Sequence, residues 1–499
     1  MKLYFAPSEL WQPDRYHYAV EQMMLTLFPG EKPEYPEVDP NTLRDENCIV
    51  FRIIPGVRAA LITAMLFRDK RLNSGCWDVP MEALKDTPEK VYHVIQHALK
   101  MAFYQAGTAL LGYEPPWGAL TGVRPVKLPT RAMKGGATPE QAKEELEELY
   151  RVSPVRAKLA LDCAQASLAA DRSLNPDEVS LYIGVPFCPT RCAYCSFVSA
   201  DVGRTLKLVE PYLEGVFREV DETARVLKEA GLTVRSLYMG GGTPTTLSAD
   251  QMDRLLAKCE EALPLDRCTE YTVEAGRPDT ITREKLAVLA KHGIGRISIN
   301  PQTLEDHVLE AIGRRHSAGD IRAAYDLARE VGFACINMDL IAGLPQDSFD
   351  GFRRSLEGVL AMDPENITVH TLALKKGSAL MEQGGAIPDG KEVVKMLDFS
   401  LKTLGGKGYA PYYLYRQKYM SGSLENVGWT KPGFDSLYNI VMMEELQTVV
   451  SIGGGGVTKL VDAPAGKIVR LPNPKYPHDY LATLDKVLAQ KQDILEFYK

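Results

Sequence analysis

One stretch of the sequence decides its interpretation: Val185-Pro186-Phe187-Cys188-Pro189-Thr190-Arg191-Cys192-Ala193-Tyr194-Cys195. The spacing C-x3-C-x2-C suits a 4Fe–4S cube, because three thiolates can hold three irons and leave the fourth open to a cofactor or substrate. A zinc site is the alternative, but structural zinc normally takes four ligands, and no histidine or further cysteine stands close by. The stretch therefore predicts an iron–sulfur cluster held by Cys188, Cys192 and Cys195.

Apolar runs alternate with helical segments on either side of this stretch, from residue 176 to 385. Strands are expected at 179–187, 234–241, 270–275, 296–302, 334–341 and 366–374, with helices such as 207–230, 249–263, 283–292 and 321–331 between them. Such alternation predicts a parallel sheet with right-handed crossovers, either an open doubly wound sheet or a partial barrel. In both folds ligands bind beyond the carboxyl ends of the strands. The cysteines follow the first strand, where such a ligand is expected.

Further polar or glycine residues stand at the ends of the following strands. The second strand ends in Gly240-Gly241-Gly242-Thr243, the third at Glu274 and the fourth at Gln302, while the fifth contains Asp339. Glycines allow a close approach of the backbone to a ligand. Two carboxyl groups and an amide beside them indicate a polar ligand, and ribose hydroxyls or an adenine edge fit this description.

The regions outside residues 176–385 do not show this regular alternation of strands and helices. Residues 1–130 are expected to form an α/β domain with a helix at 15–28, strands at 48–54 and 59–67, and a helix at 88–111 that begins after Thr87. Residues 131–175 are expected to form a helical linker, in which a helix begins with a capping box at Thr138–Gln141. Residues 386–499 are expected to form an α+β cap over the mouth of a barrel, with a helix at 391–404, a strand at 409–420 and a helix from about 479 to the end. His93 and His97 could bind a metal, but a core or surface role is favoured because no acidic partner is patterned beside them.

Size and charge exclude several classes of protein. The chain has 499 residues and a formal net charge of −7, which argues against a general nucleic-acid-binding protein. No stretch approaches the ~20 apolar residues of a membrane span, and the first residues lack the apolar core of a secretion signal. Six of the nine cysteines are scattered singly, so disulfides are not expected. A reducing cytoplasm is the expected location.

Taken together, these motifs resemble those of the radical SAM family of oxygen-independent coproporphyrinogen III oxidases, also called dehydrogenases, and their relatives the haem chaperones. The resemblance is carried by residues 182–188, 240–245, 339–345, 431–433 and 438–439, and by the glycine run that begins at Gly453. The N-terminal segment, with Trp117-Gly118-Ala119-Leu120-Thr121-Gly122, is similar to the HemZ-type branch.

The resemblance implies an α/β fold with a partial (β/α)6 TIM-like barrel, and a 4Fe–4S cluster and S-adenosylmethionine (SAM) as cofactors. Cys188, Cys192 and Cys195 would ligate the cluster, and Tyr182 would flank it in the catalytic centre. The remaining SAM-binding positions would be Gly241, Gly242 and Thr243 at the methionyl amine, Glu274 at the ribose, and Gln302, Arg314 and Asp339 elsewhere in the pocket.

The activity implied is oxidative decarboxylation of coproporphyrinogen III propionates to the vinyl groups of protoporphyrinogen IX. Its partners would be a small-molecule tetrapyrrole and a low-potential electron donor of the flavodoxin or ferredoxin type; the sequence does not define the oligomeric state. Two alternatives are open: another SAM-radical reaction on a tetrapyrrole, such as methyl transfer or haem ring opening, and a haem chaperone. Six cations near the predicted mouth could meet the substrate carboxylates, but a solvated surface charge is favoured for each: Lys375, Lys376, Arg416, Lys418, Lys431 and Lys459.

Three positions distinguish this chain from the better-known members of the family. Gly184 stands where they carry a histidine in Tyr-x-His-x-Pro-Phe-Cys, and Phe197 stands where the dehydrogenases often have a fourth cysteine. Residues 438–443 replace the His-Asn-x-x-Tyr-Trp of the haem chaperones and keep only Asn439. The missing histidine argues against haem binding in the chaperone manner.

Overall fold

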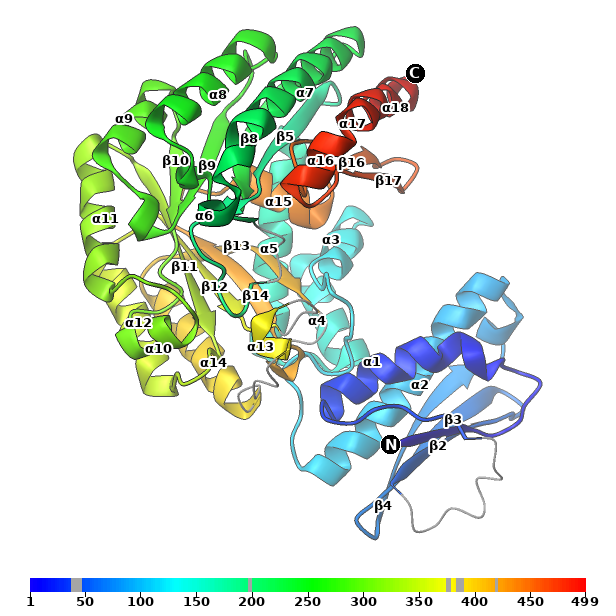
Figure 1. The fold of residues 1–499 in the computed structure, drawn as a ribbon. Coiled ribbons are helices and arrows are strands. Elements are labelled where there is room, and N and C mark those ends of the chain that lie inside the picture. The colour runs from blue at the N-terminus through cyan, green and yellow to red at the C-terminus, as the bar shows by residue number, and fades with distance from the viewer. Residues whose placement is uncertain (37–46, 196–199, 374–377, 383–389, 418–420) are drawn as a thin grey trace. The chain divides into compact units, whose positions relative to one another are not determined.

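The computed structural model describes residues 1–36, 47–195, 200–373, 378–382, 390–417 and 421–499. It divides into two compact units: unit 1 comprises Met1–Leu161 and Arg416–Leu424, and unit 2 comprises Asp162–Tyr415 and Glu425–Lys499 (Figure 1). The finer division at residues 130, 175 and 385 stays a prediction. Several predicted positions lie outside the described residues: Phe197, Leu374, Lys375, Lys376, Lys418, Met420 and the boundary at 385.

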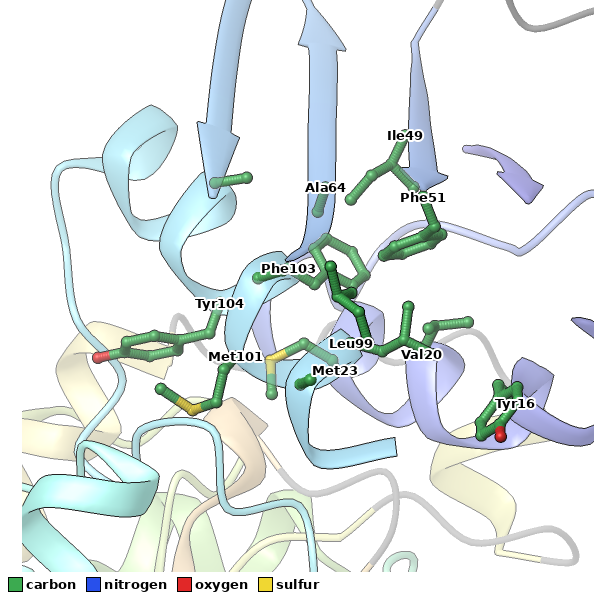
Figure 2. Close-up of a cluster of buried hydrophobic side chains, with 14 of the residues drawn as sticks. Tyr16, Val20, Met23, Ile49, Phe51, Ala64, Leu99, Met101, Phe103 and Tyr104 are labelled. Atoms are coloured by element: carbon green, nitrogen blue, oxygen red, sulfur yellow. The ribbon is translucent and has the colours of Figure 1, made fainter. Parts of the chain in front are cut away.

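Unit 1 is built on a four-stranded sheet. Its strands are β1 (Lys2–Phe5), β2 (Cys48–Ile54), β3 (Ala59–Arg68) and β4 (Arg71–Pro80), adjacent in that order. Every second residue of β3 is buried, as in a strand with one face on a core. That face packs on α1 (His17–Leu27) and α2 (Pro88–Leu111). Phe51 and Phe103 lie in this core (Figure 2), and their ring centroids are 5.7 Å apart.

The rest of unit 1 contains α3 (Lys127–Lys134), α4 (Pro139–Tyr150) and the start of α5 (Pro154–Ser173). The predicted capping box at Thr138 and Gln141 is confirmed. Thr87 occupies the N-cap position of α2, but its side chain makes no capping hydrogen bond. His97 packs edge-on against the rings of Trp77 and Tyr150, in accord with a core role.

Arg416 was expected to be a solvated charge, and this expectation is wrong, because the residue is only 5% exposed. Its guanidinium lies over the Trp117 ring, 5.3 Å from the centroid, and donates to the carbonyl oxygens of Leu120 and Ser423. The backbone N–H of Arg416 donates to the Val123 carbonyl. Arg416 therefore anchors the turn-rich segment after Trp117 within unit 1, and its charge is used there.

Unit 2 contains the predicted parallel strands, and they lie side by side in their order along the chain. They are β5 (Glu178–Val185), β8 (Thr233–Gly241), β9 (Glu270–Gly276), β10 (Arg296–Ile299), β11 (Cys335–Ala342) and β12 (Asn366–Thr371). The helices between them include α7 (Val209–Glu229), α8 (Ala249–Ala262), α9 (Arg283–Lys291), α11 (Ala318–Val331) and α12 (Phe349–Met362). These helices curve around the outside of the strands (Figure 1). The alternation confirms the predicted α/β class.

The C-terminal segment adds strands to both edges of this sheet. At one edge, β14 (Glu425–Thr430) pairs antiparallel with β12, and β13 (Ala410–Arg416) lies beyond it. At the other edge, β15 (Val449–Ile452) pairs parallel with β5, followed by β16 (Val457–Asp462) and β17 (Lys467–Pro472). Between β14 and β15 lies α15 (Leu437–Glu444). The C-terminal residues therefore complete the sheet of unit 2.

Two predicted elements differ from the structure, one in length and one in continuity. The strand expected at 296–302 stops at Ile299, and Gln302 has a left-handed φ of 68° that is incompatible with a regular strand. The helix expected from residue 479 is divided into α16 (Pro477–Ala482), α17 (Leu484–Gln490) and α18 (Gln492–Tyr498). Lys491 separates the last two, and its ammonium group forms a buried ion pair with Glu219 at 2.7 Å.

No helix within the described ranges is long and apolar enough to cross a membrane.

Candidate active site at the carboxyl ends of the strands

The three cysteines lie just beyond the first parallel strand. Cys188 is in the short strand β6 (Phe187–Cys188), and Cys192 and Cys195 are in the loop that follows. The Cys188 Sγ is 3.4 Å from the hydroxyl oxygen of Thr243, at the end of β8. The Ala193 N–H donates to the Ile312 carbonyl, and the Ala193 carbonyl accepts from Leu380 N–H, both at 2.9 Å. The cysteine loop is thus held by the turn that follows β8 and by Ile312 and Leu380, which lie in segments that follow β10 and β12.

Glycines at the end of β8 allow this approach. Gly241 has a left-handed φ of 108°, and a Cβ atom added at Gly242 would lie 2.5 Å from the Phe187 carbonyl oxygen. No side chain fits between this turn and the cysteine-bearing strand. The Gly242 and Thr243 N–H groups donate to the carbonyls of Val185 and Phe187, which fixes the turn.

Gly184 has a structural reason that the sequence did not reveal. A Cβ atom at this position would lie 2.5 Å from the carbonyl oxygen of Gly454, which belongs to the glycine run after β15. The hydroxyl of Tyr212 donates to the Gly184 carbonyl and accepts from the Gly454 N–H, both at 2.6 Å. The backbone of the glycine run therefore occupies the space of a side chain at position 184.

Glu274 lies on the inner face of the sheet beside Gly240. Its carboxylate accepts from the Tyr238 hydroxyl at 2.6 Å, and a Cβ atom at Gly240 would lie 2.9 Å from the same carboxyl group. Burial raises the pKa of Glu274 to about 7, against the lowering effect of the hydrogen bonds from Tyr238 and from the Gly241 N–H. This carboxyl group changes its charge near neutral pH.

Asp339 is held in the charged form by its neighbours. Burial alone would raise its pKa, but hydrogen bonds from His370, Asn337 and Thr368 outweigh burial and bring the pKa below its usual range. The Asn337 amide donates at 2.8 Å, and the His370 ring nitrogen is 3.6 Å from the second oxygen. Gln302 joins this group through its backbone, which donates to the Asp339 carbonyl and accepts from the Ile341 N–H.

Three tyrosine rings lie nearly parallel beside Glu274. Tyr182 of β5 and Tyr238 of β8 are register partners, and Tyr438 of α15 stacks on Tyr238 with centroids 4.5 Å apart. The Tyr182 ring is 6.5 Å from that of Tyr438. The Tyr438 side chain is buried, and its hydroxyl has no hydrogen-bond partner among the described residues. An unpaired buried hydroxyl is costly, so it is available to a ligand atom.

Arg314 lies against the cysteine loop. Its guanidinium donates to the Asn300 carbonyl at 2.6 Å and to the Tyr194 hydroxyl at 3.2 Å, and it is hydrogen-bonded to the Cys192 thiol. The residue is buried, its Nε has no partner in the described part of the chain, and none of these contacts is a carboxylate. A buried cation requires a compensating anion, and ionised thiols carrying an iron–sulfur cluster supply one.

The residues present fit such a cluster. Within the described ranges no three histidine, cysteine or acidic side chains converge on one metal ion, but a 4Fe–4S cube takes its thiolates on separate irons. No disulfide consumes any of the nine cysteines, all of which the structure describes. Three thiols on one loop with a buried guanidinium beside them match an anionic cluster with cysteine ligands.

Comparison with known proteins identifies the family. The model of the radical SAM superfamily matches residues 182–357. HemZ of Bacillus subtilis, an oxygen-independent coproporphyrinogen-III oxidase-like protein, is 40% identical over 415 residues, covering 82% of this chain and 83% of HemZ. The chain belongs to this radical SAM family. Its cofactors are accordingly a 4Fe–4S cluster and SAM.

Two other relatives mark the range of functions in the family. The haem chaperone HemW of B. subtilis is 30% identical over 266 residues, 52% of this chain and 66% of HemW. The solved structure of coproporphyrinogen III oxidase (HemN) from Escherichia coli, described as a radical SAM enzyme, has a TM-score of 0.51 at 24% identity, covering 64% of this chain and 72% of HemN. The latter shows that the two proteins share the fold.

The structure brings most of the predicted site residues to one edge of the sheet of unit 2, including Tyr182, the glycine turn, Glu274 and Asp339; their individual roles stay predictions. Two predicted cations lie elsewhere. Lys431 follows β14, which is antiparallel to β12, so it lies at the amino-terminal end of β12 and pairs there with Asp363 at 2.8 Å. Lys459 donates to the Met442 carbonyl. Three neighbours were missed: Tyr238, His370 and Arg277. Strand alternation places the first two on the face of Gly240 and Thr368, but no sequence signal distinguishes Arg277.

Proposed function

We propose that this protein catalyses the oxygen-independent oxidative decarboxylation of coproporphyrinogen III to protoporphyrinogen IX. The observation that carries the proposal is the extent of the likeness: the similarity to HemZ covers 82% of the chain, whereas that to HemW covers 52%. In the reaction each of two propionate side chains would lose CO2, one hydrogen atom and one electron and become a vinyl group, with the electron passing to an external one-electron acceptor.

The cofactors supply the radical chemistry. When bound, the cluster and SAM provide a reductively formed 5′-deoxyadenosyl radical that can abstract hydrogen from an unactivated carbon. Cys188, Cys192 and Cys195 would hold the cluster. The N–H groups of the turn Gly241-Gly242-Thr243 are engaged within the chain, so the turn would bind the methionyl amine of SAM through backbone carbonyls, where glycine permits a close approach.

Two carboxyl groups would orient the nucleoside part of SAM. The Glu274 carboxylate would accept hydrogen bonds from the ribose hydroxyls, and Tyr238 holds it in place from the other side. Asp339 stays ionised because Asn337, Thr368 and His370 donate to it, so it would accept a second set of hydrogen bonds. Gln302, fixed through its backbone to β11, would complete the pocket.

Water exclusion would fall to the tyrosine rings and the glycine run. The rings of Tyr182, Tyr238 and Tyr438 form an apolar wall beside Glu274, and the Gly454 backbone fills the space beyond Gly184. A dry site protects a reactive radical from side reactions. The Tyr438 hydroxyl, unpaired among the described residues, would donate to a ligand atom.

The reaction also needs a source of low-potential electrons. We expect a flavodoxin- or ferredoxin-type donor and a cytoplasmic location, where an oxygen-sensitive cluster survives. A haem chaperone is the second candidate, because HemW is 30% identical to this chain. Tyr438 stands where the resemblance places the histidine of the chaperones, and a stacked phenol is a weaker iron ligand than an imidazole.

Anaerobic turnover tests the proposal. Reconstituted protein with SAM, a low-potential reductant and coproporphyrinogen III should release two CO2 per porphyrinogen and yield two vinyl groups. Methylated product or released iron would favour another tetrapyrrole reaction, and tight haem binding without SAM cleavage would favour the chaperone. SAM cleavage with an intact cluster but no CO2 would overturn the proposed reaction.

A further inference from the structure

Arg277 is a buried arginine near the carboxyl ends of the parallel strands, and it is not one of the predicted SAM or cluster ligands. It follows directly after β9, three residues beyond Glu274, and is 3% exposed. Its Nε and one terminal nitrogen donate to the two carboxylate oxygens of Asp279, both at 2.9 Å. This two-point pairing fixes the plane of the guanidinium group.

The remaining terminal nitrogen of Arg277 points into the cysteine loop. It donates to the Thr190 hydroxyl at 2.7 Å and to the Thr190 carbonyl at 3.2 Å. Thr190 lies midway between Cys188 and Cys192. Arg277 therefore bonds both the side chain and the backbone of the residue that connects the first two thiols.

The segment that carries Arg277 is itself fixed. The Arg277 carbonyl accepts from the backbone N–H and the hydroxyl of Thr280. The Thr280 hydroxyl is 2.7 Å from that of Thr245, which also donates to the Ala275 carbonyl. Thr245 belongs to the turn that follows Gly241–Thr243, so the SAM-binding turn and the cysteine loop are tied to the same support.

Stability alone does not account for this arrangement. A buried ion pair gains little over well-packed apolar side chains, because both charges must be desolvated. Groups that hold ligand-bearing segments in place raise the affinity of metal sites, and their loss typically costs 10- to 100-fold. The contacts of Arg277 are directed at the loop that carries the cluster ligands.

We propose that Arg277 is a positioning residue for the iron–sulfur cluster. Its guanidinium fork, oriented by Asp279, holds Thr190 so that Cys188 and Cys192 are presented to the cluster in a fixed arrangement. The inference rests on the proposed binding of the cluster by Cys188, Cys192 and Cys195. It does not depend on which substrate the enzyme uses.

The test measures how firmly the full-length protein holds its cluster. Wild type, Arg277→Met, Arg277→Lys and Thr190→Val are reconstituted anaerobically, and iron release to a chelator is followed together with thermal unfolding. Arg277→Met and Arg277→Lys should lose iron about 10-fold faster than wild type, because lysine keeps the charge but not the fork. Thr190→Val should lose iron faster as well, by a smaller factor, because the backbone contact remains.

Arg267→Met is the matched control, since Arg267 forms an exposed ion pair with Asp177 and should release iron at the wild-type rate. Wild-type retention in Arg277→Met would overturn the inference, as would full rescue by lysine, which would reduce the effect to charge. If Arg277→Met does not fold, Thr190→Val decides, and unchanged iron release there is contradictory. Failure of wild type to take up any cluster would instead refute the proposed function.

Discussion

The two ends of strand β9 carry glutamates with different surroundings. At the amino-terminal edge, Glu270 accepts from the Ser436 hydroxyl at 2.8 Å and from the N–H groups of Leu437 and Tyr438, so it caps the start of α15. At the carboxyl edge, Glu274 accepts from Tyr238 and stands beside a glycine, and its pKa is raised to about 7. One carboxylate is saturated by the chain itself, whereas the other retains capacity for a ligand.

Two buried arginines in unit 2 differ in what they bind, although the Nε of each has no partner among the described residues. Arg296, at the amino-terminal edge, donates to the Asn366 side chain and to the Phe434 carbonyl at 2.7 Å, and so joins strands to the segment before α15. Arg314, at the carboxyl edge, is directed at the cysteine loop. At the amino-terminal ends of the parallel strands, these polar side chains bond to other parts of the chain and stabilise the fold. At the carboxyl ends, they face the cysteine loop and can contact a ligand.

The largest expected effect comes from removing one cluster thiol. Cys192→Ala should leave no SAM cleavage above background, because two thiolates do not hold the cube. Cys163→Ala is the matched control, since Cys163 is also buried but lies in α5. Iron content and 5′-deoxyadenosine formation after anaerobic reconstitution provide the measurement. Normal SAM cleavage by Cys192→Ala would contradict the assignment of the cluster to the cysteine loop at the carboxyl ends of the strands.

A substitution at the amino-terminal ends of the parallel strands should change the stability of the protein but not its iron content. Glu270→Ala removes the cap of α15 and should lower the free energy of unfolding by about 2 kcal/mol in urea titrations. Iron bound per folded chain should stay unchanged, because Glu270 lies at the edge opposite to the cysteines. The exposed Glu261→Ala serves as control. Loss of iron from folded Glu270→Ala would show that the two edges are not independent.

Gly184 tests whether the glycine run closes the carboxyl edge as described. Gly184→Ala should cost about 1–3 kcal/mol of stability, because its methyl group meets the Gly454 carbonyl. Gly295→Ala is a suitable control, since nothing lies within 4 Å of an added Cβ atom there. Equal melting temperatures of the two variants would argue against this packing.

Glu274 should give the smallest effect, and one that depends on pH. Because its pKa is about 7, SAM affinity should rise about 10-fold between pH 6 and 8 as the carboxylate ionises. Since the pKa is raised in the folded state above 4.5, folding stability should fall as pH increases from about 4.5 to 7. Both dependences should be weaker in Glu274→Gln. Equilibrium SAM binding and urea titrations across this range measure them, and a wild-type pH profile in the variant would exclude Glu274 as their source.

Much of the fold was predictable because the parallel strands of unit 2 are apolar runs separated by helices with clear caps. Two strands of unit 1 were missed for identifiable reasons. β1 has four residues, and β4 contains Gly75 and few apolar residues. Gly75 is required there because a Cβ atom would lie 2.1 Å from the Ala102 carbonyl. Such a requirement of tertiary packing leaves no local signal.

The site was predictable as far as spacing and strand ends carry information. The cysteine spacing and the polar residues after each strand indicated where a ligand would bind. Strands β14 and β15 pair with β12 and β5, the two outermost parallel strands. These pairings depend on contacts distant in sequence, which local periodicity does not encode. For the same reason the roles of Gly454 and Arg277 at the cysteine loop emerged only from the structure.

The most direct test of the open carboxyl edge is electron paramagnetic resonance of the reduced, reconstituted protein with and without SAM. A cluster held by three cysteines leaves one iron available, so adding SAM should shift the spectrum of the reduced cluster in wild type. The spectrum should be absent from Cys192→Ala and preserved in Glu270→Ala. An iron–sulfur spectrum that does not change with SAM, or zinc in place of iron in anaerobically purified protein, would contradict the account.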